Sequence, residues 1–210
     1  MSANLGTASR FYRGTTITPS AGGGQIRLKH RELFLTDKMK NATEKTVTDA
    51  RFKVLTARAR MAMSPLPADV AAALTLYFKT GASASAGDTN AIIAVLELIS
   101  NGINADVNIK VSQINKTYLD PGERQSDTEG YVRGTVGDIH VTPDYIKNNP
   151  FQAVRTFIHE ASHRYADTDD FDEQGYIKAD GSDFREAGIS NADCLKNADS
   201  YAYFVMKVAP

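Results

Sequence analysis

The feature that most constrains this chain is the pattern H-E-x-x-H, formed by His159, Glu160 and His163. Residues four apart share one face of an α-helix, so the two imidazoles can reach one metal ion from the same side. Glu160 then lies beside the ion without ligating it, which suits a base for a water molecule that the ion activates. The chain has four histidines, and two of them fall in this spacing. The pattern therefore predicts a metal site on a helix.

The residues before the pattern predict that helix. Asn149 is a good N-cap, and Pro150 suits the first helical position. An apolar stripe at helical spacing follows, made of Phe151, Val154, Phe157, Ile158 and Ala161. An ordinary amphipathic helix, whose histidines make only hydrogen bonds, would show the same stripe. The metal site is the better interpretation, because His, Glu and His coincide on a helix with clear start signals.

A catalytic zinc ion takes three protein ligands and keeps one position open, so the chain must supply a ligand beyond the helix. The turn after the helix is rich in carboxylates, namely Asp167, Asp169, Asp170 and Asp172. Further along the chain, a second helix could return Glu186 to the site. Spacing alone leaves the near turn and Glu186 both open as sources of the third ligand.

The stretch resembles the aspzincin metallopeptidases, the family of deuterolysin and the lysine-specific metalloendopeptidases. Their pattern continues H-E-x-x-H with G-T-x-D-x-x-Y-G, in which the Asp is the third zinc ligand. The matching residues are Asp167-Thr168-Asp169-Asp170, so the resemblance implies Asp170 as the ligand and leaves Asp169 as the alternative. It also implies that Tyr176 supports the transition state. Two departures are that Asp167 stands where the family has glycine and that the interval from Asp to Tyr is longer.

A second segment carries the same resemblance. Residues 197–204 read Asn-Ala-Asp-Ser-Tyr-Ala-Tyr-Phe, similar to the Asn-Ala-Asp-Ser-x-Glu-Tyr-Phe segment of lysine-specific members. There the Asp and Glu form a pocket for a lysine side chain, which implies Asp199 as a substrate-binding residue. Ala202 replaces the Glu, so strict lysine specificity is not expected. An Asp at this place can instead orient a zinc-bound histidine.

The function predicted from these residues is zinc-dependent endopeptidase activity on protein or peptide substrates, with one Zn²⁺ per chain. Glu160 would act as general base, and Tyr176 would bind the developing oxyanion. The acidic turn and Asp199 predict a preference for a basic residue next to the cut. The non-catalytic alternative is a binding or effector protein with a structural metal, and Glu160 argues against it because a structural site has no use for a base.

The resemblance implies an α+β, zincin-like fold, mostly helical, with a small mixed sheet whose edge strand borders the active-site cleft. Residues 1–40 are predicted to form an N-terminal arm or short strands, and residues 41–210 a catalytic domain, with one compact domain overall. Periodicity predicts helices over 41–63, 88–101 and 191–207, and strands over 107–111 and 138–143. We expect the strand over 138–143 to be the sheet edge that pairs with substrate, and its His140 to face solvent.

Composition excludes several classes of protein. A formal net charge of −1 gives no reason to expect nucleic acid or an anionic membrane as partner. No apolar run approaches the ~20 residues of a membrane span. The first residues lack an apolar signal core, which predicts synthesis in the cytoplasm without a Sec signal. A specialised secretion system, with a delivery or immunity partner, is compatible with this. The single cysteine, Cys194, allows no internal disulfide.

Overall fold

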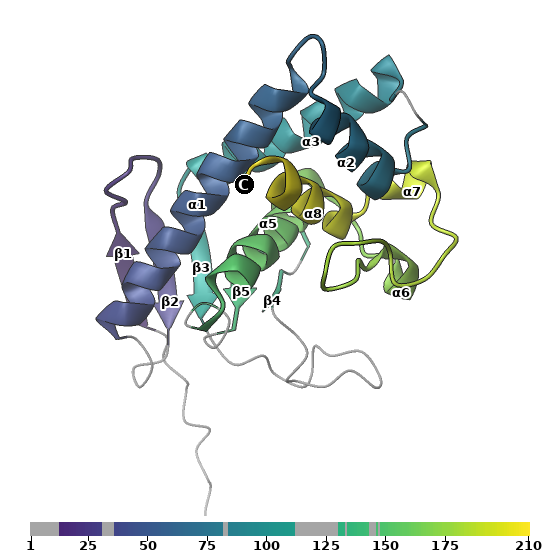
Figure 1. Ribbon diagram of the computed structural model, residues 1–210. Helices are drawn as coiled ribbons and strands as arrows, with labels where there is room; N and C mark the ends of the chain where they lie inside the picture. Colours follow the sequence, from purple (N-terminus) through teal and green to yellow (C-terminus); the bar gives the residue numbers. More distant parts are fainter. Residues whose placement is uncertain are drawn as a thin grey trace, which may run out of the picture.

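The computed structural model describes residues 13–30, 36–81, 84–111, 130–132, 134–142, 146 and 148–210. These residues form an α+β fold in which helices cover one face of a small mixed sheet (Figure 1). The predicted α+β class is therefore confirmed. Residues 1–12 and 31–35 of the predicted N-terminal arm lie outside the described residues.

Within the described residues, the sheet has five strands in the order β1-β2-β3-β5-β4. The β1–β2 and β4–β5 pairs are antiparallel, and the β2–β3 and β3–β5 pairs are parallel. Side chains of β2 alternate between buried and exposed, because only one face of the sheet packs against the helices. The strands are β1 (Arg13–Ile17), β2 (Ile26–His30), β3 (Val107–Val111), β4 (Gly130–Tyr131) and β5 (Ile139–Val141).

The strand predicted over 138–143 is β5, but it is not the sheet edge. β5 lies between β3 and β4, so the described edge next to the H-E-x-x-H helix is β4. Residue 143 lies outside the described part of the chain. The prediction that His140 faces solvent is also wrong, since His140 is 7% exposed and its ring stacks on that of Tyr131 at 3.9 Å. β4 was not predicted, because two residues show no periodicity.

Helices are present in the predicted regions 41–63, 88–101 and 191–207, with two differences, and the short helix over 172–175 was not predicted. The first begins before the predicted Asn41, because the Thr36 hydroxyl accepts a hydrogen bond from the Met39 N–H. The predicted final helix over 191–207 is two helices, because the chain bends at Asn197, whose backbone pairs with that of Asp169. The helices are α1 (Asp37–Met61), α2 (Ala68–Phe78), α3 (Ala86–Asn104), α5 (Pro150–Ala166), α6 (Asp172–Gly175), α7 (Asn191–Cys194) and α8 (Ala198–Val208). Among the described residues, no helix has the length and apolarity to cross a membrane.

Helix α5 runs through the middle of the fold, between the sheet and the helices α1, α3 and α8 (Figure 1). Four of the five residues of its predicted apolar stripe are buried, and Phe151 is an exception at 60% exposure. The complete burial of a side chain such as Phe157 stabilises the fold by roughly 1.5–3 kcal/mol. Gly102 lets α3 approach α5 closely, because a Cβ at Gly102 would lie 2.2 Å from the ring of Tyr165 in α5. The packing fixes α5 rigidly on both sides.

Candidate metal centre

Helix α5 carries the H-E-x-x-H pattern as predicted. The side chain of Asn149 caps the helix by accepting a hydrogen bond from the Gln152 N–H at 3.3 Å, and Pro150 occupies the first position. The helix continues to Ala166, so His159, Glu160 and His163 all lie within regular helix.

A sharp turn after α5 brings the chain back beneath the helix end. Asp167 has a φ of 53°, in the left-handed region that favours glycine at this position. The glycine that the aspzincin pattern has at this position would adopt this φ without strain. The backbone of Asp169 is then held by Lys196 and Ala198, through Asp169 N–H to Lys196 O at 2.8 Å and Ala198 N–H to Asp169 O at 3.0 Å. The Asp169 side chain is exposed, and the next carboxylate, that of Asp170, lies at the histidines.

The side chains of His159, His163 and Asp170 converge on one point. The two Nε2 atoms are 3.1 Å apart. Asp170 Oδ1 lies 3.3 Å from the Nε2 of His159, and its Oδ2 lies 3.4 Å from the Nε2 of His163. A tetrahedral zinc ion with bonds of about 2.0–2.2 Å separates its ligand atoms by about 3.3–3.5 Å. The spacing of the three groups therefore fits a zinc ion.

The other nitrogen of each imidazole has its own acceptor. His163 Nδ1 lies 2.7 Å from the carbonyl oxygen of Thr168, and His159 Nδ1 lies 2.9 Å from Asp199 Oδ1. A carbonyl oxygen can only accept, so Nδ1 of His163 carries the proton, and the Asp199 carboxylate favours the same tautomer for His159. In the neutral rings both Nε2 lone pairs then face each other and the Asp170 carboxylate. A proton or a metal ion among these electron pairs would stabilise them, and two nitrogens with one carboxylate suit zinc.

The electrostatics of the site in the absence of metal favour a positive charge at the same point. Burial lowers the pKa of His159, but Asp170 and Asp199 outweigh it and raise that pKa well above its ordinary value. Burial also lowers the pKa of His163, and Asp170 again raises it overall. Burial raises the pKa of Asp170, whereas the two imidazoles lower it far below its ordinary value. The surrounding carboxylates therefore favour positive charge at the imidazoles.

Glu160 lies next to this cluster and is 5% exposed. Burial raises its pKa to about 7, against the opposing effect of charged His159 and His163. Within the described residues, no hydrogen bond reaches its carboxylate. A carboxylate that titrates near neutrality can both accept and return a proton, which general acid–base catalysis requires.

Asp199 uses both of its carboxylate oxygens inside the protein. Oδ1 contacts His159, and Oδ2 accepts a hydrogen bond from the backbone N–H of Ile177 at 2.9 Å. The residue is 8% exposed, and Ala202, which replaces the glutamate of the lysine-specific pattern, is completely buried in α8. Of the two roles considered for Asp199, the geometry favours the orientation of His159 over substrate binding.

Tyr176 directly precedes Ile177, so the hydrogen bond to Asp199 holds the backbone next to Tyr176 beside the metal cluster. The guanidinium of Arg185 lies 5.0 Å above the centre of the Tyr176 ring. The backbone N–H of Arg185 donates a hydrogen bond to the backbone carbonyl of Tyr176 at 2.8 Å. These contacts hold the Tyr176 backbone and place a guanidinium over its ring.

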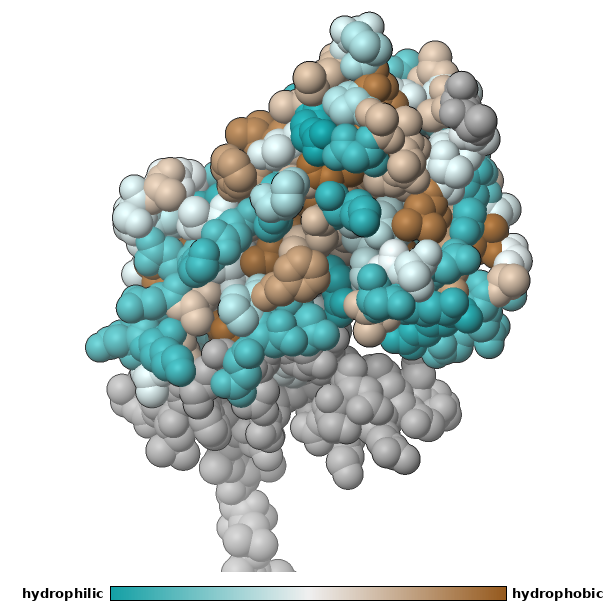
Figure 2. Space-filling view, viewed as in Figure 1, coloured by the Kyte–Doolittle hydropathy of each residue, from teal (hydrophilic) through white to brown (hydrophobic). Residues whose placement is uncertain are grey.

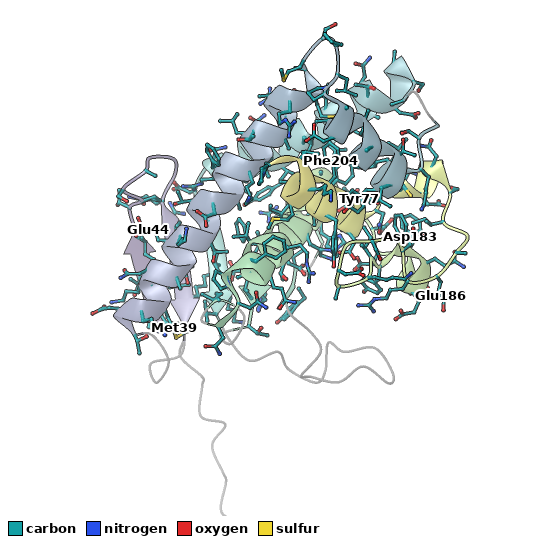
Figure 3. All side chains as sticks on the ribbon, in the orientation of Figure 1. Met39, Glu44, Tyr77, Asp183, Glu186 and Phe204 are labelled. Carbon is teal, nitrogen blue, oxygen red and sulfur yellow. The ribbon has the colours of Figure 1, made fainter. Side chains whose placement is uncertain are left out.

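Glu186 is not part of the His–His–Asp cluster found among the described residues. It lines an open cavity of about 470 Å³ next to Asp170, with Phe171, Asp172, Glu173 and Gln174. Figure 3 labels Glu186 beside α6, at the periphery of the molecule, and Figure 2 shows a hydrophilic surface over this region. The cavity therefore presents acidic side chains beside the metal cluster.

Sequence reasoning gave no role to three residues that shape this site. Thr168 contributes a backbone carbonyl, which no side-chain pattern reveals. Asn197 holds the end of α6 in place, since its Nδ2 donates to the carbonyl of Gly175 at 2.8 Å. Gly130 of β4 lies against Glu160. The Asn-Ala-Asp-Ser segment, which carries the family resemblance, was a signal for Asn197, whereas nothing in the sequence marked Gly130.

No protein-family model matches the sequence, and no curated protein matches it either. Among solved structures, the fold is similar to that of a zinc peptidase from Grifola frondosa, with a TM-score of 0.59 and 16% sequence identity. The match covers 82% of this chain and 96% of that chain. At this identity the likeness establishes a shared fold, so the chain has the fold found in that zinc peptidase.

Proposed function

We propose that this protein is a zinc-dependent endopeptidase of the aspzincin type, with His159, His163 and Asp170 as ligands of one Zn²⁺ per chain. One observation carries the proposal. The two Nε2 atoms and the Asp170 carboxylate converge at distances that suit zinc, while each Nδ1 atom has its own acceptor. The fold shared with a zinc peptidase supports the same function.

In this proposal, a bound zinc ion would act as a Lewis acid that polarises the scissile carbonyl and lowers the pKa of the attacking water. Glu160 accepts a proton from the attacking water and passes it to the leaving amine. Asp199 keeps the proton of His159 on Nδ1 and so leaves the Nε2 lone pair free to bind the ion. Tyr176 donates a hydrogen bond to the developing oxyanion.

Among the candidates for third ligand, Asp170 has the best support. The backbone hydrogen bonds of Asp169 direct its side chain to solvent. Glu186 lines the neighbouring cavity instead of the cluster. The non-catalytic alternative has less support, because it gives no reason to bury Glu160 beside the ligands.

The substrates that we propose are proteins or peptides with a basic residue next to the cut. The support comes from Asp172, Glu173 and Glu186 around the cavity beside Asp170, and not from Asp199. Arg185 offsets part of this charge, since its guanidinium lies 3.4 Å from Glu173. Digestion of a mixed peptide library without enrichment of Lys or Arg beside the cut would contradict this preference.

The experiment that tests the function combines zinc content with hydrolysis of casein. Wild type should bind about one zinc ion and cleave, and Glu160→Gln should keep the zinc and lose cleavage by several orders of magnitude. Asp170→Ala should lose both zinc and cleavage, whereas Asp169→Ala and Glu186→Ala should keep both. A wild-type protein that binds no zinc would refute the proposal, and an Asp170→Ala variant with full zinc content would refute the ligand assignment.

A further inference from the structure

We propose that Gly130 is a positioning residue for Glu160, an inference that rests on the proposed peptidase function. Gly130 lies in β4, which pairs antiparallel with β5 at the edge of the described sheet, opposite Val141. The strand passes over the face of α5 that carries Thr156 and Glu160, which are one helical turn apart. The missing side chain at position 130 lets the backbone of β4 close directly over the base.

The space at Gly130 is too small for a side chain. A Cβ atom there would lie 2.7 Å from the carbonyl oxygen of His140, 2.9 Å from Cγ2 of Thr156 and 3.2 Å from Cγ of Glu160. Two of these distances are shorter than real Cβ contacts, and one of the two is to backbone. A side chain at this position must therefore displace β4 or the two α5 side chains beneath it.

β4 cannot easily move away from α5. Its two residues are hydrogen-bonded to β5, and the ring of Tyr131 stacks on that of His140 with an interplanar angle of 18°. Thr156 and Glu160 are buried on a helix that packs on several sides. The strain of an added Cβ therefore falls partly on the β4–β5 pairing at the carbonyl oxygen of His140 and partly on the side chains of Thr156 and Glu160.

Glu160 is buried, so its side chain is held by its packing contacts. Contacts along the Glu160 side chain help to fix its rotamer, and position 130 is close enough to make one, since a Cβ there would lie 3.2 Å from its Cγ. Catalytic groups work best when held within about 0.5 Å of the productive geometry, and a misplacement of about 1 Å can cost about a hundredfold in rate. The β4 backbone at Gly130, from which a Cβ would come within 3.2 Å of Cγ of Glu160, supplies this restraint.

Gly130→Ala is the test, with zinc content, melting temperature, kcat and KM measured on the full chain with casein or a peptide cut from it. We expect kcat to fall about 10- to 100-fold, which corresponds to about 1.4–2.7 kcal/mol, with zinc content, melting temperature and KM close to those of wild type. Gly14→Ala is the matched control, because Gly14 lies in β1 of the same sheet and a Cβ there meets nothing within 4 Å. This control should behave as wild type.

A second variant tests whether the added Cβ acts through its clash with Thr156. Thr156→Ser removes the Cγ2 atom and keeps the hydroxyl, so the double variant Gly130→Ala/Thr156→Ser should recover part of the lost kcat. A Gly130→Ala variant with wild-type kcat would overturn the proposal, and so would one that loses zinc or melts far earlier, because Gly130 would then have a structural role only. An inactive wild type would instead refute the proposed function.

Discussion

Replacement of Asp199 by Asn tests the network behind the candidate metal ligands. The Asp199 carboxylate accepts from two donors with two different oxygens, Nδ1–H of His159 and the backbone N–H of Ile177, both at 2.9 Å. An asparagine amide of the same shape has one acceptor oxygen and one NH₂ group. In Asp199→Asn, the NH₂ group must therefore face one of these two N–H donors, which then has no acceptor.

The magnitude follows from which donor loses its acceptor. A buried donor without a partner costs about 1–3 kcal/mol, and Asp199 is 8% exposed. If His159 loses the acceptor, its Nδ1 proton is no longer favoured, and zinc affinity should fall about 10- to 100-fold, as is typical for partners of metal-bound histidines. If Ile177 loses the acceptor, the cost lowers the free energy of unfolding instead. Whichever donor loses its acceptor, the loss should amount to at least about 1 kcal/mol.

Two assays separate these effects. Competition with a chromogenic chelator gives the zinc dissociation constant, and thermal melting of the chelated protein gives the stability. Asp169→Asn is the matched control, since it makes the same change in charge on an exposed side chain of the turn beside the site. An Asp199→Asn protein that binds zinc as tightly as the Asp169→Asn control and melts with wild type would refute the reasoning.

Three further predictions concern stability and zinc binding. Asp167→Gly should stabilise the protein by about 0.5–1 kcal/mol, because φ at this position is 53° and glycine adopts it without a steric penalty. The melting temperature should rise by about 1–4 °C with unchanged zinc content, and a lower melting temperature would contradict this. For the chelated protein, burial raises the pKa of Glu160 from 4.5 to about 7, so the folded state binds more protons than the unfolded state between these values. Stability should therefore fall as pH rises through this window, and the raised pKa values of His159 and His163 extend the fall above pH 6.5. Zinc needs deprotonated imidazoles, so the thermal shift on adding zinc should be larger at pH 7.5 than at pH 5.5; equal shifts would argue against this assignment of charge.

The elements that the sequence predicted well are those that local interactions determine. The N-cap at Asn149, the proline after it and the apolar spacing specify α5, since each acts within a few residues. The placement of His159, Glu160 and His163 on neighbouring positions of one helix follows from helical periodicity alone. The α+β class was implied by the family resemblance, and the helical and strand periods of the separate segments agree with it.

The elements that sequence reasoning missed depend on contacts between distant segments. β5 was predicted as the sheet edge, but the short strand β4 takes that place, and no periodicity in two residues signals it. The predicted final helix divides at Asn197, because the backbone there pairs with Asp169, a residue of the turn after α5. Neither event leaves a pattern in the local sequence.

The sequence by itself therefore determined the helix with its two histidines and the glutamate between them. Only the tertiary structure decided which carboxylate lies beside them. Asp170 reaches the histidines because Asp167 reverses the chain and because Lys196 and Ala198 hold the backbone of Asp169. Asp199 reaches His159 because α8 packs against α5. Helical periodicity acts over a few residues, whereas the approach of these carboxylates depends on the path of the whole chain.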